Sequence, residues 1–205
     1  MNSTKSFTSI LIVLLLIFLA SCSKLRKSWT KEGYVGKSFP RLAIVVINPD
    51  PVERKSFQDL VISSFAASEI QVVTDAVLFI YEEVSDSVID RRVADLRLDG
   101  ILTVGLITSD ENQFISPENY NKFSKFYSHR FTGLNTPQYL AKSSTYVMEG
   151  VLHDLTEVHE IVWRGEMALL DPKNASAKKR FLNRMTKELV EEGLIKSTKS
   201  PRSSS

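Results

Sequence analysis

Hydrophobic and polar residues along the first half of the chain follow a pattern that predicts alternating strands and helices. Residues 41–48 and 100–107 are branched and almost uninterrupted apolar runs, which are typical of strands covered on both faces. Residues 70–81 predict a further strand between them, with a bend near Thr74-Asp75. The order strand, helix, strand, helix, strand favours crossovers onto a largely parallel sheet.

Two polar motifs indicate where the intervening helices begin. Asp50-Pro51-Val52-Glu53 has a capping residue, a proline and an acid in the order of a helix N-terminus. Ser87-Val88-Ile89-Asp90 resembles a second capping box, and we expect Gly100 to stop the helix that it begins.

The second half of the chain predicts a hairpin and a last helix. Residues 145–155 and 158–169 read as antiparallel strands joined by a tight turn at 154–157. In the second strand, apolar residues alternate with Arg164 and Glu166, so we expect one buried face, with Trp163 in the core. The helix is expected to begin at Asp171-Pro172 or Asn174. Its apolar face and its C-terminal cap would be formed by Phe181, Leu182, Met185, Leu189 and Gly193.

Together these elements predict an α/β fold. The order is β-α-β-α-β, followed by an antiparallel β-hairpin and a C-terminal helix, arranged in two or three layers around a mixed sheet.

The N-terminal segment has the layout of a secretory signal peptide, because one cation, Lys5, is followed by an unbroken apolar run from Ile10 to Ala20. This run is shorter than the about 20 apolar residues that span a bilayer. Leu19-Ala20-Ser21-Cys22 resembles the lipobox of bacterial lipoproteins, which implies that Cys22 carries a diacylglyceryl group and a further acyl chain such as palmitate. The alternative is an ordinary signal peptide with an incidental cysteine, although Cys22 is the only cysteine in the chain.

This resemblance sets the expected organisation and location. Residues 1–21 would be the signal peptide, 22–40 a basic tether attracted to anionic head groups, 41–195 a single periplasmic domain and 196–205 a disordered tail. Ser23, rather than Asp, after the cysteine resembles the Gram-negative sorting signal for the outer membrane. We therefore expect a lipid anchor in the periplasmic leaflet of the outer membrane. With its only thiol acylated, the chain would have no disulfide and no thiol chemistry.

The charge balance argues against nucleic acid as a partner. Removal of the signal peptide takes away one of the 26 basic residues, Lys5, and none of the 24 acidic residues. The mature chain is therefore nearly neutral and lacks the field that captures nucleic acid.

Residues 108–142 form an insertion rich in aromatic side chains mixed with cations, a mixture that interaction surfaces use. Equally, half of these rings could cover the core or the sheet edge, and the stretch could contain a short helix near 117–127. The candidate partner-binding residues are Phe114, Tyr120, Phe123, Phe126, Tyr127, Arg130 and Phe131.

No catalytic constellation is predicted. His153 and His159 flank the hairpin turn near Asp154, but such residues at a strand end are more often ordinary polar surface than a metal site. His129 has no glycine-flanked serine nucleophile to serve, and the acidic pairs Glu82-Glu83 and Asp110-Glu111 are typical of solvated turns. We expect a protein that is not an enzyme, with no cofactor and no metal.

The mature domain resembles small bacterial lipoproteins of unknown function whose fold is similar to the periplasmic part of CsgG and the N-terminal domain of TolB. The matching stretches are the strand RLAIVVINPD, Asp99-Gly100-Ile101-Leu102, and the hairpin HDLTEVHEIVWRGE, with Asp154 before the turn and Val162-Trp163-Arg164-Gly165 after it. The resemblance implies fold and location, and it implies no catalytic residues.

The resemblance also implies a role in envelope assembly or secretion. Together with the predicted anchor and the aromatic insertion, it leads us to expect a membrane-anchored accessory factor that binds an envelope protein, with homo-oligomerisation through the hairpin edge. A module that binds peptidoglycan or another glycan is the alternative. A hydrolase built on His129 or on the acidic strand ends is a third and weaker hypothesis.

Overall fold

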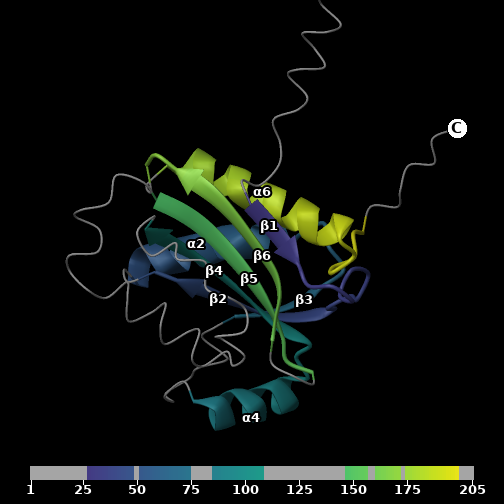
Figure 1. Ribbon diagram of the computed structural model, residues 1–205. Helices are drawn as coiled ribbons and strands as arrows, with labels where there is room; N and C mark the ends of the chain where they lie inside the picture. Colours follow the sequence, from purple (N-terminus) through teal and green to yellow (C-terminus); the bar gives the residue numbers. More distant parts are fainter. Residues whose placement is uncertain are drawn as a thin grey trace, which may run out of the picture.

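The computed structural model describes residues 27–48, 51–74, 85–108, 146–156, 160–171 and 174–198, which form a mixed six-stranded sheet with helices on both faces (Figure 1). The strands are β1 (Lys27–Thr30), β2 (Arg41–Ile47), β3 (Gln71–Thr74), β4 (Gly100–Thr108), β5 (Tyr146–Asp154) and β6 (Ile161–Leu169). The helices are α2 (Pro51–Ser64), α4 (Asp86–Leu96) and α6 (Ala175–Glu191). The predicted α/β fold is confirmed.

The spatial order of the strands is β1-β6-β5-β4-β2-β3. β2 lies between β3 and β4 and is parallel to both, as the strand-helix-strand pattern predicted. β4, β5, β6 and β1 are antiparallel to their neighbours, which confirms the predicted hairpin. β4 pairs with β5 along its whole length, and β1 pairs with residues 163–166 of β6, so most of the hairpin edge is covered within the chain. Association of copies through this edge stays a prediction.

The main core lies between the sheet and two helices that contact each other, α2 and α6 (Figure 1). α6 begins where Asn174 caps it, since the Asn174 side chain accepts a hydrogen bond of 2.9 Å from the Ala177 amide. Its apolar residues then recur every three or four positions and are buried against β5 and β6. Trp163 is fully buried in this core, as predicted.

On the opposite face α4 covers one end of the sheet, where Ile89 and Leu98 pack on Val45 and Ile101. Farther along the same face, the charged side chains Arg164 and Glu166 are only 8% and 5% exposed. The prediction that only one face of β6 is buried is therefore wrong. An alternating pattern identifies the two faces of a strand, but it does not reveal what covers the polar one.

The limits of α4 differ from the prediction. Ser85, rather than Ser87, caps the helix, since its Oγ accepts from the Val88 amide at 3.4 Å. The helix ends at Arg97, which has the left-handed conformation with φ 51°. Gly100 instead starts β4, where a Cβ atom would lie 2.6 Å from the carbonyl oxygen of His153. This glycine allows two strands to approach closely and does not end the helix.

Two segments predicted to be unstructured are folded. From Lys27 onward the predicted tether forms β1 and a loop, and Phe39 is only 1% exposed. The strand was missed because its stability comes from backbone pairing with β6 and not from an apolar pattern of its own. Residues 196–198 of the predicted tail hydrogen-bond to residues 67–69.

Other predicted features fall outside the described residues. They include the signal peptide, Cys22, the continuation of the second predicted strand beyond Thr74, and nearly all of the 108–142 insertion. Within the part of the chain that the structure describes, no helix is long and apolar enough to cross a membrane.

Candidate functional site

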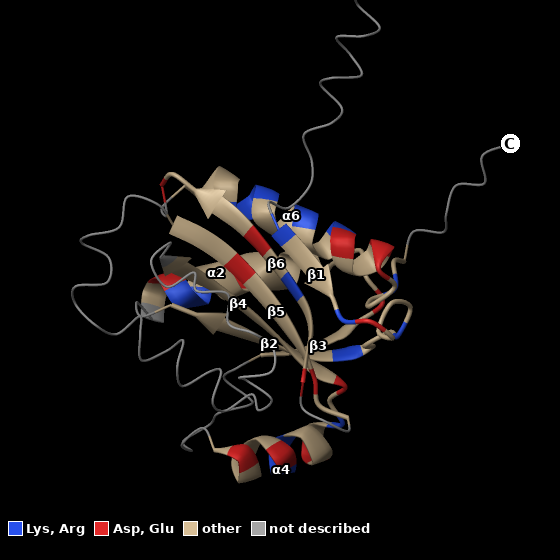
Figure 2. Ribbon diagram, in the orientation of Figure 1, with Lys and Arg blue, Asp and Glu red and all other residues tan. Residues whose placement is uncertain are grey.

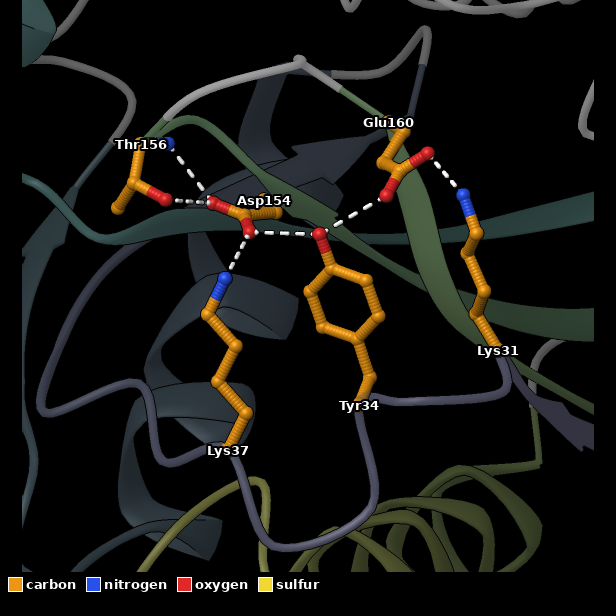
Figure 3. Close-up of polar contacts among 6 residues, drawn as sticks. All are labelled: Lys31, Tyr34, Lys37, Asp154, Thr156 and Glu160. Carbon is orange, nitrogen blue, oxygen red and sulfur yellow. Dashed lines mark hydrogen bonds and ion pairs between the residues drawn. The ribbon is translucent and has the colours of Figure 1, made fainter.

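A cluster of polar side chains lies at the end of the hairpin, around Asp154 (Figure 3). Asp154 is the last residue of β5 and is 1% exposed. Its amide donates to the carbonyl of Glu160 at 2.9 Å, which closes the described part of the hairpin. On the other side, the amide and hydroxyl of Thr156 donate to Asp154 Oδ1 at 2.7 and 2.6 Å. This turn, stabilised by the aspartate side chain, fixes the carboxylate inward.

The loop after β1 supplies the remaining partners of the carboxylates. The Tyr34 hydroxyl lies 2.9 Å from Asp154 Oδ2 and 2.8 Å from Glu160 Oε1. Because a phenol carries one hydrogen, it donates to one of these carboxylates at a time. Lys37 Nζ donates to Asp154 Oδ2 at 2.7 Å, and Lys31 forms an ion pair with Glu160. We call Lys31, Tyr34, Lys37, Asp154, Thr156 and Glu160 the Asp154 cluster.

Packing fixes Tyr34 in this position. Its ring stacks on the buried ring of Phe39, with centroids 6.4 Å apart and planes inclined by 11°. Lys37 Nζ lies 4.6 Å from the centroid of the Tyr34 ring, so the ammonium contacts both a π face and a carboxylate. Gly33 and Gly36, on either side of Tyr34, have φ values of 84° and 85°, which produce the turns of this loop.

The surroundings shift the pKa values of two groups in the cluster. Burial alone would raise the pKa of Asp154, but hydrogen bonds from Lys37, Thr156 and Tyr34 outweigh burial and lower it below the ordinary 3.8. Burial, together with hydrogen bonds to Glu160 and Asp154, raises the pKa of Tyr34 far above 10.0. At neutral pH, Asp154 is therefore ionised with its acceptors occupied, and Tyr34 is protonated.

This arrangement is suited to holding the chain together rather than to moving protons. An ionised carboxylate that already accepts three hydrogen bonds, and a fourth when Tyr34 donates to it, is a poor base, and a phenol with a raised pKa is a poor nucleophile. The contacts join residues that are 117 to 129 positions apart in the sequence. The Asp154 cluster thus fastens residues 31–37 to the hairpin.

A second polar group lies within the sheet, on the face opposite α6. Glu149 and Glu166 are direct neighbours on β5 and β6, an arrangement in which like charges repel. Arg164 Nη2 lies 2.6 Å from Glu149 Oε1 and 2.7 Å from Glu166 Oε1. The guanidinium therefore offsets the repulsion between the two buried carboxylates. Removal of Arg164 alone would leave both carboxylates buried without this positive charge.

The structure corrects the interpretation of the hairpin end as ordinary polar surface. His153 and Asp154 are both fully buried, and the loop of residues 31–37 places Tyr34 and Lys37 against Asp154. His159 lies outside the described residues. In the described ranges, no group of three or more His, Cys, Asp or Glu side chains could hold a metal ion.

The remaining predicted site residues are not placed by the structure. Cys22, the seven candidate partner-binding residues of the insertion, His129 and the two acidic pairs all lie outside the described residues. Sequence reasoning missed Tyr34 and Lys37. The available signal was the pair of glycines in the stretch Gly33-Tyr34-Val35-Gly36, which is more typical of an ordered turn than of a tether.

The described fold and site define an α/β domain in which an N-terminal edge strand and its loop are fastened to a hairpin by buried carboxylates. No family model and no curated protein matches the chain. Two solved structures of the PelC dodecamer from Paraburkholderia phytofirmans, one of them a point variant, are distantly similar. Their sequences are 7% and 8% identical to this chain, and the TM-scores are 0.41 and 0.42. Each similarity covers 82% of this chain, and 98% and 97% of the respective PelC chain. This likeness is too distant to transfer a function.

Proposed function

We propose that this protein is a lipoprotein, anchored through Cys22 in the periplasmic leaflet of the outer membrane. It would bind an envelope protein as an accessory factor in assembly or secretion. The observation that carries the proposal is that β1 of the sheet begins at Lys27, only five residues after the predicted lipidation site. The domain is then held at the membrane surface and not on a long tether.

Chain geometry limits how far the domain could move from its anchor. Five fully extended residues span at most about 18 Å. Lys27 is already paired with Glu166 in the sheet, so these five residues are the whole link between the anchor and the domain. A domain under this constraint can meet partners embedded in the same membrane far more readily than distant ones.

The Asp154 cluster supports a fixed orientation as well as a short distance. A load on the anchor passes into β1, and from there into the loop of residues 31–37. Tyr34, Lys37 and Lys31 connect that loop to the hairpin side chains Asp154 and Glu160. The loop is therefore joined to the centre of the sheet, which favours one constant face of the domain toward the membrane.

The predicted partner-binding residues are in the segment that connects β4 to β5. That segment leaves after Thr108 and returns at Tyr146, and these two residues are paired in the sheet. At the other end of the same strand pair, Gly100 is paired with Asp154. The proposed binding segment therefore starts and ends at the opposite end of the β4–β5 pair from the Asp154 cluster.

The first test is lipidation. Cells grown with an alkyne analogue of palmitate should label the wild-type chain and not Cys22→Ser, and only the wild type should fractionate with the outer membrane. Labelling of neither chain would contradict the proposed anchor.

The second test is capture of the partner. A photo-crosslinking residue at Phe123, Phe126 or Tyr127 should give one discrete adduct in wild-type cells and none with Cys22→Ser. The same residue at Lys55, which is 69% exposed on α2, provides the control position. If the protein is palmitoylated but gives no adduct, and is retained on purified peptidoglycan, the glycan-binding alternative would replace this proposal.

A further inference from the structure

Basic residues are concentrated in the first three-quarters of α6. Residues 175–187 contain five basic side chains and no acidic one, and acids follow only at Glu188 and Glu191 (Figure 2). The five are Lys178, Lys179, Arg180, Arg184 and Lys187. This segregation contrasts with the nearly balanced charge of the whole chain.

The position of these cations does not favour helix stability. The N-terminal turn of a helix carries a partial positive charge, so acids stabilise it and cations destabilise it by a few tenths of a kcal/mol each. α6 has no acid in its first turn. The cations of α6 begin only at Lys178, its fourth residue, and none lies in the last turn, so the helix dipole does not account for their number.

Two of the five cations have partners within the fold. Lys178 Nζ lies 5.6 Å from the centroid of the Phe57 ring and 4.0 Å from Glu53, and Arg184 Nη1 lies 3.6 Å from Met167 Sδ. These side chains pack α6 against its neighbours.

The other three cations form an exposed basic face. Lys179 and Arg180 are exposed and make no ion pair or hydrogen bond within the described part of the chain. Lys187 lies 3.5 Å from Glu191 in an exposed pair of the kind that contributes little. We call Lys179, Arg180 and Lys187 the basic face of α6.

The chain enters the fold close to the basic half of α6. Arg184 on α6 contacts Met167 on β6, and the neighbouring Glu166 is paired with Lys27, the first residue of β1. Figure 1 shows β1 and α6 on the same side of the molecule, with α4 at the far end. An anchor on Cys22 therefore attaches within about 18 Å of Lys27, on the side that carries these cations.

We propose that the basic face of α6 binds the anionic phospholipid head groups of the membrane that holds the anchor. The inference rests on the proposed anchor for its location, and on the charge of α6 for its chemistry. Cations near a negatively charged lipid surface each add to binding, and an acyl anchor raises their local concentration at that surface.

The composition of the exposed face favours lipid head groups over a protein partner. Besides its cations, α6 exposes Ala175, Ser176, Asn183 and Glu191, and no aromatic or large aliphatic side chain. Interfaces with proteins concentrate their affinity in such apolar and aromatic anchors, which this face lacks. Dispersed cations on a polar helix surface are instead complementary in charge to the mobile phosphate groups of a lipid surface.

The test uses fluorescence quenching on vesicles. The acylated protein has no free thiol, so Asn183→Cys introduces a single labelling site on the exposed face of α6. Ala94→Cys introduces one on an exposed position of α4 as the control. With phosphatidylglycerol in the vesicles, nitroxide head groups should quench the α6 label strongly and the α4 label weakly. Salt should reduce the α6 quenching, as should vesicles of phosphatidylcholine alone.

A charge variant makes the test specific. Lys179→Gln, Arg180→Gln and Lys187→Gln together should lower the preference for anionic over neutral vesicles by about a hundredfold. A control that neutralises the same number of exposed cations elsewhere, Lys55→Gln, Arg91→Gln and Lys196→Gln, should lower it far less. Equal quenching on neutral and anionic vesicles, or equal losses for the two triple variants, would overturn the proposal.

The outcome is separable from that of the proposed function. Palmitoylated protein with equal quenching on both kinds of vesicle contradicts the role of α6 alone. If Cys22 proves not to be acylated, the same labels on the processed Cys22→Ser chain can be tested after attachment by an N-terminal hexahistidine tag to nickel-chelating lipid. Preferential quenching of the α6 label there would support head-group binding without the natural anchor, and its absence would refute it.

Discussion

At the scale of single residues, the charge of Asp154 is the feature on which the Asp154 cluster depends. Asp154→Asn keeps the shape of the side chain but removes the ion pair with Lys37. It also replaces one acceptor oxygen by an NH2 donor, which leaves some of the donors around it without an acceptor. We expect a loss of about 2–3 kcal/mol in the free energy of unfolding, less than for a fully buried pair because Lys37 is 44% exposed. Urea denaturation measures this loss. Asp95→Asn, at an exposed position of α4, should change stability by less than about 0.5 kcal/mol.

The same substitution has a defined pH dependence. The pKa of Asp154 is lowered on folding, so the unfolded chain takes up this proton first as the pH falls. The stability that Asp154 contributes is therefore complete above its ordinary pKa of 3.8 and is lost as the pH falls through the lower folded pKa. The difference in stability between wild type and Asp154→Asn should be constant near neutral pH and shrink in acid. A difference that grows in acid would contradict this account.

At the scale of elements, the end of α6 packs closely on the loop that follows β1. Gly193 has φ +72°, and a Cβ atom there would lie 2.8 Å from the Gly36 Cα atom. Gly193→Ala should therefore cost about 2–4 kcal/mol, because backbone strain adds to a clash with backbone that cannot turn away. Gly33→Ala is the matched control, since Gly33 has φ +84° and open space around it. Its cost should be about 1 kcal/mol, from strain alone. Equal melting temperatures for the two variants would show that the loop yields to the added methyl group.

Elements with a regular pattern of apolar residues or a capping residue of their own could be predicted from the sequence. β2 and β4 are continuous apolar runs, and α6 combines a capping Asn174 with apolar residues at helical spacing. β1 has no such pattern, since Lys27 and Ser28 are exposed and its stability comes from pairing with β6. The cap of α4 was misplaced because Ser85 and Ser87 can both cap a helix, and the capping-box spacing favours Ser87, which has Asp90 three residues later, over Ser85, which has Val88 there. Only the backbone geometry distinguishes between them.

At the scale of the whole molecule, the candidate site could not be predicted because, like β1, it depends on contacts between residues that are far apart in the sequence. Asp154 was visible in the sequence, but its partners Tyr34 and Lys37 lie 120 and 117 positions away. Local spacing indicates which residues share a face of one element. It does not indicate that the sheet order brings β1 beside β6, and therefore the loop of residues 31–37 over the hairpin end. The burial of Asp154 follows from that topology.

The distance between anchor and domain is the whole-molecule property that the proposed function requires. A flexible Gly/Ser insertion of twenty residues before Lys27 would raise the link from five to twenty-five residues and give the inserted stretch a root-mean-square length of about 25 Å. Effective concentration at the membrane falls roughly as the −3/2 power of linker length, so the yield of the partner adduct should fall about tenfold. Palmitate incorporation should not change, because the lipobox is intact. The same insertion after Thr198, where described structure ends, should leave the adduct at its wild-type yield. An adduct that survives the N-terminal insertion undiminished would mean that the short link has no role in partner binding. The membrane would then serve only to retain the protein.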